Sequence, residues 1–377
     1  MEQLLGSLCD ELSKNHRLFI ITAYADHSGP PKTGIFRPSR PGLLAFFCYA
    51  LWKGVLLLRC HREIQVVFGG SSLVTPLVCI LARIFRRKAL IQAHGLDLLY
   101  PNFFYQMLIV RWLRFCDHII ANSRYTAVLA KDKGACENSI TIIHPGVYWR
   151  RFAMPVAMGA LKLERDLQGK RIILFVGRLA RRKGVKEFIE KSLDRIIREL
   201  PDVRFLIVGD NPKDSLTHRD DVRAEIEQAI SACHLQEHVQ WLGALSDDDL
   251  VKVYKLCDLV VLPILKMKDD VEGFGIVALE AAAAAKPVVA TDVGGVPDAV
   301  EDGRSGIVVG SGDDEAMSQS IIELLVRDEI KSSLGEYAQR RVRERFCWSS
   351  TITRYEKTLF QILEMNDAKC VAAHADD

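Results

Sequence analysis

Two kinds of segment, distinguished by the spacing of their apolar residues, alternate along most of the chain. Short runs rich in Val and Ile are separated by longer segments in which apolar residues have helical spacing. This alternation is typical of parallel βαβ units, whose strands are covered by helices on both faces. The pattern predicts strands over residues 17–22, 64–68, 89–93, 118–121 and 140–143, and then over 172–176, 204–208, 239–241, 259–262, 287–290 and 306–309.

The strands fall into two groups, which predicts two doubly wound α/β domains. A chain of 377 residues also exceeds the size of one ordinary hydrophobic core. We place one Rossmann-like domain at residues 1–155 and a second at 156–345, joined near 150–170. Residues 346–377 are predicted to form a helix that packs back toward the first domain, followed by a flexible tail.

The beginning of the chain departs from this scheme. Residues 1–16 have a helical pattern, whereas a doubly wound domain opens with a strand and a glycine-rich turn. We therefore expect that the first strand of the first domain and the loop after it are missing. A different strand order in that domain is the alternative that the sequence leaves open.

The apolar stretch 43–58 is interrupted by Lys53 and Gly54, and two arginines flank it on each side. It is shorter than the roughly 18 to 20 uninterrupted apolar residues of a spanning helix. We favour a helix buried in the first domain. A helix lying on an anionic bilayer is the alternative, because the flanking arginines suit such a surface.

The net charge differs in sign between the first and the second part of the chain. Residues 1–150 carry 18 Lys and Arg against 9 Asp and Glu, a net charge of +9, whereas the remainder carries 32 against 39, a net charge of −7. A basic half suits anionic lipid, nucleic acid or a phosphorylated substrate. No nucleic-acid recognition motif accompanies the charge, so we do not expect nucleic acid as a partner. The ten cysteines include no C-x-x-C pair, which favours a reducing cytoplasm.

The segment "LFVGRLARRKGV" predicts a cationic loop at the end of a strand. Gly177 follows the strand 172–176, and Arg178 and Lys183 lie five residues apart in the loop. Ligands of open α/β sheets bind at the carboxyl ends of the strands. Arg178 can donate two hydrogen bonds to a phosphate, and Lys183 adds a point charge.

The segment "EGFGIVALE" predicts an anion site at a helix N-terminus. If the helix begins at Gly275, the free N–H groups of the first turn and the helix dipole attract a phosphate. Glu280 then lies about one turn inside the helix, where its carboxylate can accept hydrogen bonds from sugar hydroxyls. Glu272 precedes the helix and meets another part of the ligand. The turn at Gly294 and Gly295 follows another strand and adds backbone amides to the same edge.

No metal and no other cofactor are expected. Neither a D-x-D motif nor a cluster of His, Cys and Asp occurs in a setting that argues for a bound divalent ion. The acidic run 247–249 is predicted to begin a helix, and Asp269 and Asp270 to lie in a solvated loop.

Together these segments resemble a known family. "VGRLARRKG", "EGFGIVALE" and "TDVGGVPDAVEDGRSGIVV" are similar to the nucleotide-sugar half of the retaining GT-B glycosyltransferases of family four, and "QAHGLD", "ANSRYT" and "IIHPGV" are similar to its acceptor-side half. The resemblance covers nearly the whole chain. "DDVEGFGIVALEA" looks most like the phosphatidylinositol mannosyltransferase branch and its GDP-mannose-using relatives.

The resemblance implies a role for each candidate residue. Arg178 and Lys183 would neutralise the diphosphate leaving group, Glu280 would hold the ribose and Glu272 the transferred sugar. His94, in "AHG", would face that sugar near the reacting carbon. The backbone amides for the diphosphate would come from Phe274, Gly275 and Ile276, beside the turn of Gly177.

The expected activity is metal-independent transfer of a hexose, with mannose from GDP-mannose as the first candidate, onto a lipid-linked or glycan acceptor. The expected location is cytoplasmic, peripheral at the inner face of the membrane. Two alternatives remain: a nucleotide-sugar epimerase on the same scaffold, and a binding protein whose catalysis is impaired by the missing strand. Tyr148 departs from the family pattern, in which an aspartate commonly follows "HPGV".

Overall fold

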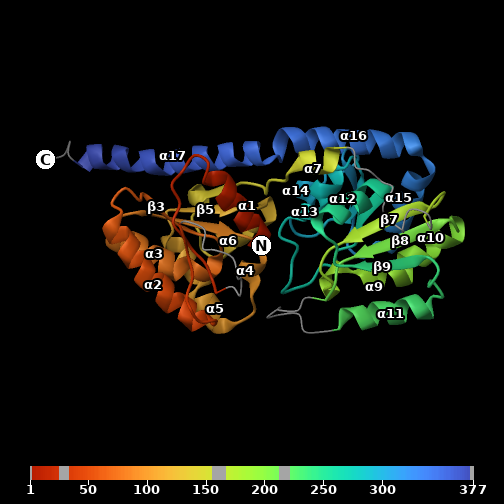
Figure 1. Ribbon diagram of the computed structural model, residues 1–377, viewed down its shortest axis with the longest axis horizontal. Coiled ribbons are helices and arrows are strands. Elements are labelled where there is room, and N and C mark those ends of the chain that lie inside the picture. Colours follow the sequence, from red (N-terminus) through yellow and green to blue (C-terminus); the bar gives the residue numbers. More distant parts are fainter. Residues whose placement is uncertain (1, 25–33, 155–166, 212–220, 374–377) are drawn as a thin grey trace. The chain divides into compact units, whose positions relative to one another are not determined.

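The computed structural model describes residues 2–24, 34–154, 167–211 and 221–373. It divides into two compact units (Figure 1). Unit 1 comprises Met1–His144 and Thr351–Asp377, and unit 2 comprises Pro145–Ser350. Most of the predicted connection, at residues 155–166, and the end of the predicted tail, at 374–377, lie outside the described residues.

Unit 2 contains a six-stranded parallel sheet of order β12-β11-β10-β7-β8-β9. The order reverses between β10 and β7, which are neighbours in space although two strands separate them in sequence. In open α/β sheets such a reversal creates the crevice in which ligands bind. The strands are β7 (Arg171–Val176), β8 (Val203–Val208), β9 (Val239–Gly243), β10 (Leu259–Leu262), β11 (Val288–Thr291) and β12 (Gly306–Val309).

Helices cover both faces of this sheet. Successive residues of β7 point to opposite sides, so Leu174 belongs to one hydrophobic cluster and Phe175 to the other. The helical segments are α7 (Trp149–Ala153), η4 (Arg181–Lys183), α9 (Val185–Glu187), η5 (Phe188–Leu193), α10 (Asp194–Glu199), α11 (Val222–Ala232), α12 (Asp247–Leu256), α13 (Ile276–Ala283), α14 (Val296–Ala299), α15 (Asp314–Val326) and α16 (Asp328–Arg345).

Unit 1 contains a four-stranded parallel sheet of order β3-β4-β5-β6, and a separate pair, β1 and β2. Its strands are β1 (Ile20–Ile21), β2 (Ile35–Phe36), β3 (Val66–Gly69), β4 (Lys88–Ala93), β5 (His118–Ala121) and β6 (Ile140–Ile142). Its helical segments are α1 (Glu2–Leu12), α2 (Leu43–Cys60), η1 (Ser72–Val74), α3 (Thr75–Phe85), α4 (Leu96–Leu99), α5 (Phe103–Leu108), η2 (Val110–Phe115), α6 (Arg124–Asp132), η3 (Glu137–Ser139) and most of α17 (Trp348–Ala373).

The C-terminal helix α17 is tied to this unit by polar contacts. The Tyr355 hydroxyl donates a hydrogen bond to Gln92 on β4, and Asn15 donates one to Glu356 at 2.9 Å. These bonds join the last helix of the chain to a central strand and to the segment after α1.

The predicted α/β fold with two parallel sheets is confirmed, and most predicted strands match within two residues. The predicted strand 17–22 is wrong in extent, because only Ile20 and Ile21 are extended, and they pair with β2 rather than with the main sheet. The short strand β2 was not predicted. Among the described strands β3 is an edge of the main sheet. The missing first strand stays a prediction.

The predicted burial of the apolar stretch 43–58 is wrong. Residues 43–60 do form one helix, α2, but only Ala50, Gly54, Leu57 and Leu58 of it are buried. By length and composition α2 is the one described helix apolar enough to cross a membrane, yet it packs against α3, where a Cβ on Gly54 would lie 2.7 Å from Leu81 Cδ1. The helix therefore lies on unit 1 with the side chains of Leu43, Leu44, Leu51, Trp52 and Leu56 exposed.

Candidate active site

The turn after β7 presents Arg178 at the edge of the sheet. The Gly177 N–H donates to the Val208 carbonyl at 3.0 Å, and a Cβ on Gly209 would lie 1.9 Å from the Gly177 carbonyl oxygen. The turns after β7 and β8 are therefore in direct contact. Arg178 follows at once and is exposed.

Lys183 is buried at the end of the turn η4. Gly184 follows with φ of 65°, and a Cβ there would lie 1.9 Å from the Pro263 carbonyl oxygen. A glycine is needed both for the left-handed conformation and for the close approach. The absence of a side chain at Gly184 therefore allows η4 to pack closely against the segment that follows β10.

An ion network joins η4 to the loop after β10. Lys183 Nζ lies 2.7 Å from Glu272 Oε2, and the Arg182 guanidinium donates to the same oxygen. Arg182 Nε also lies 3.0 Å from Asp270 Oδ1. Burial alone would raise the pKa of Glu272, but the charges of Lys183 and Arg182 lower it to about 2. The carboxylate is therefore ionised at neutral pH.

Gly275 marks the start of α13, as predicted. It has φ of 84° and ψ of 58°, and Ile276 is the first helical residue. No described side chain caps this N-terminus. The first-turn N–H groups and the positive end of the helix dipole are thus available to an anion.

The double-glycine turn after β11 supports this loop. The Gly295 N–H donates to the Glu272 carbonyl at 2.9 Å, and a Cβ on Gly294 would lie 2.2 Å from that carbonyl oxygen. The main chain at Glu272 is therefore fixed by two neighbouring turns.

Glu280 lies in a different environment from Glu272. The Tyr254 hydroxyl of α12 donates to Glu280 Oε2 at 2.7 Å. Burial raises the pKa of Glu280 to about 7, although the hydrogen bond from Tyr254 opposes the shift. The two carboxyl groups therefore titrate in different pH ranges, with Glu272 fully ionised near neutral pH and Glu280 only in part.

His94 lies in unit 1, directly after β4. Its Nε2 is 3.0 Å from the Gly70 carbonyl oxygen, and because a carbonyl only accepts, Nε2 carries the proton in this contact. Asp97 accepts hydrogen bonds from the backbone N–H groups of His94, at 2.9 Å, and of Ser72, at 2.8 Å. A buried carboxylate thus fixes the turn that carries the histidine.

The structure brings Lys183, Glu272 and the start of α13 together, as expected from the sequence. The expectation that Asp270 is solvated is wrong, because Asp270 is buried beside Arg182. Arg182 and Tyr254 were not predicted. Arg182 could have been found from the sequence, because it lies next to Lys183. Tyr254 could not, because it is 26 residues from Glu280 and no local pattern connects the two.

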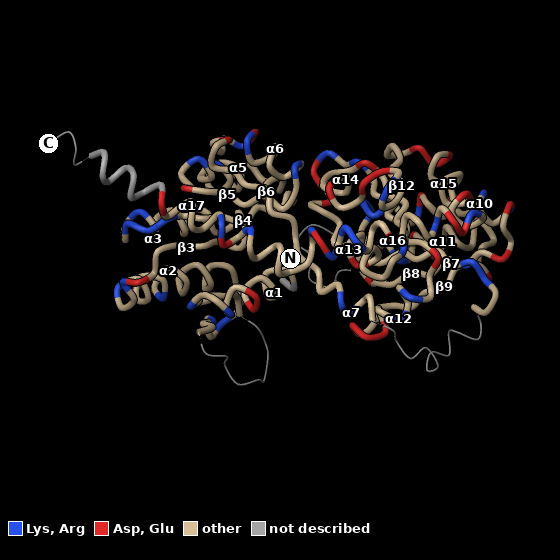
Figure 2. The backbone as a smooth tube through the Cα atoms, turned by 90° about the horizontal axis from the view of Figure 1, so that it is seen from above, with Lys and Arg blue, Asp and Glu red and all other residues tan. Residues whose placement is uncertain are grey.

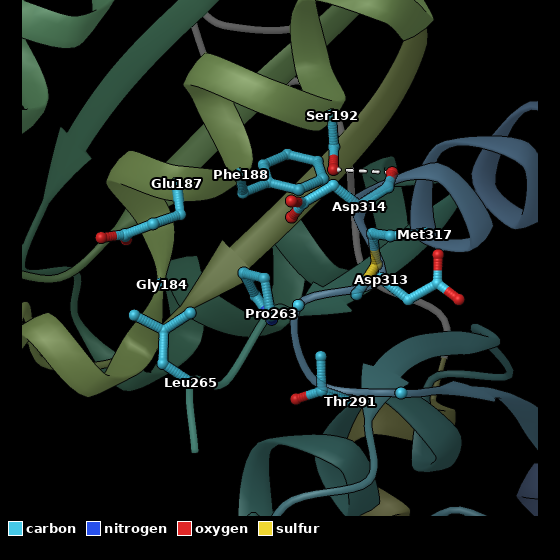
Figure 3. A pocket seen from close by; sticks show the side chains of 12 residues that line it. Gly184, Glu187, Phe188, Ser192, Pro263, Leu265, Thr291, Asp313, Asp314 and Met317 are labelled. Carbon is cyan, nitrogen blue, oxygen red and sulfur yellow. Dashed lines mark hydrogen bonds between the residues drawn. The ribbon is translucent and has the colours of Figure 1, made fainter. Parts of the chain in front are cut away.

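A small cavity of about 20 Å³ lies near Ser192, between η5 and the N-terminus of α15. The Ser192 hydroxyl donates to the Asp314 carbonyl at 3.2 Å (Figure 3). This volume holds about one water molecule, so the cavity as it stands is not a nucleotide site. Within the described ranges no group of three or more His, Cys, Asp and Glu side chains is arranged to hold a metal ion.

Two family descriptions match separate regions of the chain. Residues 1–148 match Glycosyltransferase Family 4, and residues 163–341 match Glycosyl transferases group 1. One similar curated protein is the D-inositol 3-phosphate glycosyltransferase of Corynebacterium urealyticum, 31% identical over 217 residues, which are 56% of this chain and 49% of that protein. The chain spans about half the length of the curated relatives it matches.

Solved structures share the fold over nearly the whole chain. Sucrose-phosphate synthase from Thermosynechococcus elongatus has a TM-score of 0.76 at 20% identity, covering 96% of this chain and 93% of that one. HepE of Anabaena in complex with UDP-glucose has a TM-score of 0.68 at 21% identity, covering 94% and 100%. Together these likenesses show the GT-B fold, with residues 1–148 similar to Glycosyltransferase Family 4 and residues 163–341 similar to the group 1 glycosyl transferases.

Proposed function

We propose that this chain is a retaining glycosyltransferase that moves a hexose from a nucleoside-diphosphate sugar without a metal ion. One observation carries the proposal: the ion pair of buried Lys183 and partly buried Glu272 lies beside the uncapped N-terminus of α13 and the turn of Gly177. A preorganised cation and free backbone amides are what a departing diphosphate requires.

Each half of the donor has a counterpart in unit 2. The diphosphate would accept hydrogen bonds from Arg178, from Lys183 and from the amides of Phe274, Gly275 and Ile276. The bound diphosphate would compete with Glu272 for the ammonium group of Lys183. The Glu272 carboxylate could then accept hydrogen bonds from the hydroxyls of the hexose. Glu280 would accept from the ribose hydroxyls while Tyr254 keeps the carboxylate in place.

His94 would face the hexose from the acceptor-side domain. Its Nε2–H is engaged with the Gly70 carbonyl in this structure, and Asp97 fixes the backbone on which it sits. A fixed ring position favours a role in orienting the sugar near the reacting carbon.

The family resemblance favours mannose from GDP-mannose as the donor. UDP-glucose is the second candidate, since it is the ligand in the HepE structure. The proposed acceptor is a lipid-linked molecule or a glycan, met by a cytoplasmic protein at the inner face of the membrane.

A donor panel of GDP-mannose, UDP-glucose and UDP-N-acetylglucosamine, incubated with membrane lipid extract, tests the proposal. We expect a product from one donor, and nuclear magnetic resonance should show that the anomeric configuration of the donor is retained. An altered free sugar formed without acceptor would favour an epimerase. Nucleotide binding without turnover would favour an impaired binding protein.

A further inference from the structure

The apolar side chains of α2 that face solvent continue onto neighbouring helices of unit 1. Leu44 is 79% exposed, Trp52 60% and, on α3, Ile84 65%. On α5, Phe103 is 72% exposed and Phe104 65%. We name as the apolar face the exposed side chains of Leu44, Leu51, Trp52, Leu56, Ile80, Ile84, Phe103, Phe104, Met107, Leu108 and Phe115.

These side chains belong to one layer of the unit. Helix α2 packs on α3, α3 packs on η2, and η2 packs on α5. Figure 1 shows α2, α3 and α5 as the orange helices along the lower left of unit 1. Isolated exposed apolar residues are ordinary on a soluble protein, but a set of this size on contiguous helices indicates an interaction surface.

The charged residues around the apolar face indicate which kind of partner it can bind. Residues 37–116 contain 11 Lys and Arg but only two acidic residues, Glu63 and Asp97, and Asp97 is buried. Blue Lys and Arg positions lie beside α2 and α3 in Figure 2. Eight of the arginines are exposed: Arg37, Arg40, Arg59, Arg62, Arg83, Arg86, Arg111 and Arg114. Apolar side chains rimmed by arginines match the acyl boundary and the headgroups of an anionic bilayer.

Helix α5 connects this face to the turn of His94. The Tyr105 hydroxyl donates to the Asp97 carbonyl at 2.8 Å, and Gln106 Nε2 donates to the carbonyls of Leu98 and Tyr100 at 3.0 and 2.9 Å. Asp97 in turn holds the backbone of His94. Phe103 and Phe104 therefore extend from a helix that is bonded directly to the candidate acceptor-side turn.

We propose that the apolar face docks unit 1 on an anionic lipid bilayer, with α2 and α5 lying in the interface, so that the turn of His94 is held at the membrane surface. Docking keeps α2 packed on α3 and does not require it to span the bilayer. The consequence for the acceptor rests on the proposed function, because it names that acceptor as a molecule presented at the membrane surface. Docking itself does not depend on transfer.

Vesicle sedimentation of the full chain tests the proposal. We expect binding to vesicles of phosphatidylglycerol and phosphatidylcholine at a roughly 1:2 ratio, little binding to phosphatidylcholine alone, and weakening as NaCl rises from about 0.1 M to about 0.5 M. The triple variant Trp52→Ser, Phe103→Ser, Phe104→Ser should lower the partition coefficient at least about tenfold. Phe360→Ser is the matched control, because Phe360 on α17 is 58% exposed outside the apolar face.

Two further measurements test whether Trp52 enters the bilayer and whether the triple variant is still folded. In Trp52→Phe, binding should persist while the fluorescence blue shift on adding vesicles falls, which would place that position in the interface. Nucleotide binding by the triple variant without lipid should equal that of the unaltered chain. Equal vesicle binding by the triple variant and the unaltered chain would overturn the proposal. A dimer that the triple substitution dissociates, with no vesicle binding, would overturn it in favour of a contact between two copies.

Discussion

Lys183 Nζ and Glu272 Oε2 lie 2.7 Å apart although 89 residues separate them in the sequence. Their contact joins the turn after β7 to the loop after β10, across the point where the strand order of unit 2 reverses. The cation and the carboxylate are thus held together in the absence of a ligand, and in the proposed function a diphosphate would take over the contact with Lys183.

Glu272→Gln should destabilise unit 2 by about 2–4 kcal/mol, because it leaves the buried ammonium of Lys183 without a charged partner. Chemical denaturation followed by circular dichroism measures the change. The double variant with Lys183→Met is the control. Its destabilisation should be smaller than the sum of the two single changes by about 1–3 kcal/mol, and strict additivity would show that the pair is not coupled.

Gly294→Ala should be far more harmful than Gly303→Ala. Both glycines have similar positive φ, 61° and 67°, but a Cβ on Gly294 meets the Glu272 carbonyl while a Cβ on Gly303 meets nothing within 4 Å. Gly303→Ala should cost only the backbone strain of about 1 kcal/mol. Gly294→Ala should also displace the Glu272 loop and weaken donor binding. Equal denaturation midpoints for the two variants would contradict the packing argument.

Tyr254→Phe should raise the KM for the donor with little change in kcat, because the hydroxyl holds Glu280 without touching the reacting atoms. The lost hydrogen bond should also cost about 1–2 kcal/mol of stability. Tyr337→Phe removes a comparable hydroxyl that donates to Glu301 at 3.0 Å, away from the candidate site. That control should leave the KM unchanged, and an unchanged KM in Tyr254→Phe would refute the positioning role.

Stability should depend on pH through Glu280. Its pKa is raised from 4.5 to about 7 in the folded protein, so the folded state binds more protons than the unfolded state between these values. Stability from this group is therefore present below about pH 4.5, declines as pH rises and levels off above about pH 7. Relative to Glu280→Gln, the protein should lose about 1–3 kcal/mol between pH 5 and pH 8. A pH-independent difference would contradict the buried, protonated carboxyl.

Local signals in the sequence predict much of the candidate site in unit 2. The strand-to-glycine turns at Gly177 and Gly275 and the spacing of Glu272 and Glu280 are visible within short segments, because parallel strands place their carboxyl ends at one edge. Tyr254 could not be found in this way, since its hydrogen bond depends on how α12 packs against α13. The burial of Asp270 was missed for the same reason: it follows from an ion pair with a residue 88 positions away.

Unit 1 was harder to predict. The apolar composition of α2 favours a buried helix, and only its packing on α3 shows which side chains remain exposed. The segment 17–22 has the composition of a strand, but the partner that it pairs with is a two-residue strand with no sequence signal of its own. The exposure of α2 and the extent of β1 both depend on contacts with segments that are distant in the sequence.

Titration calorimetry with GDP and UDP on the unaltered chain, Arg178→Ala and Arg198→Ala tests the central claim most directly. Arg178 is exposed at the edge of the sheet, so its removal should not disturb folding, and Arg198 on α10 is an exposed arginine of the same unit. The proposal predicts that one nucleoside diphosphate binds, that Arg178→Ala weakens this binding at least about tenfold through loss of a charge-assisted contact, and that Arg198→Ala has no effect. No binding of either nucleotide to the unaltered chain, or equal affinity in Arg178→Ala, would contradict it.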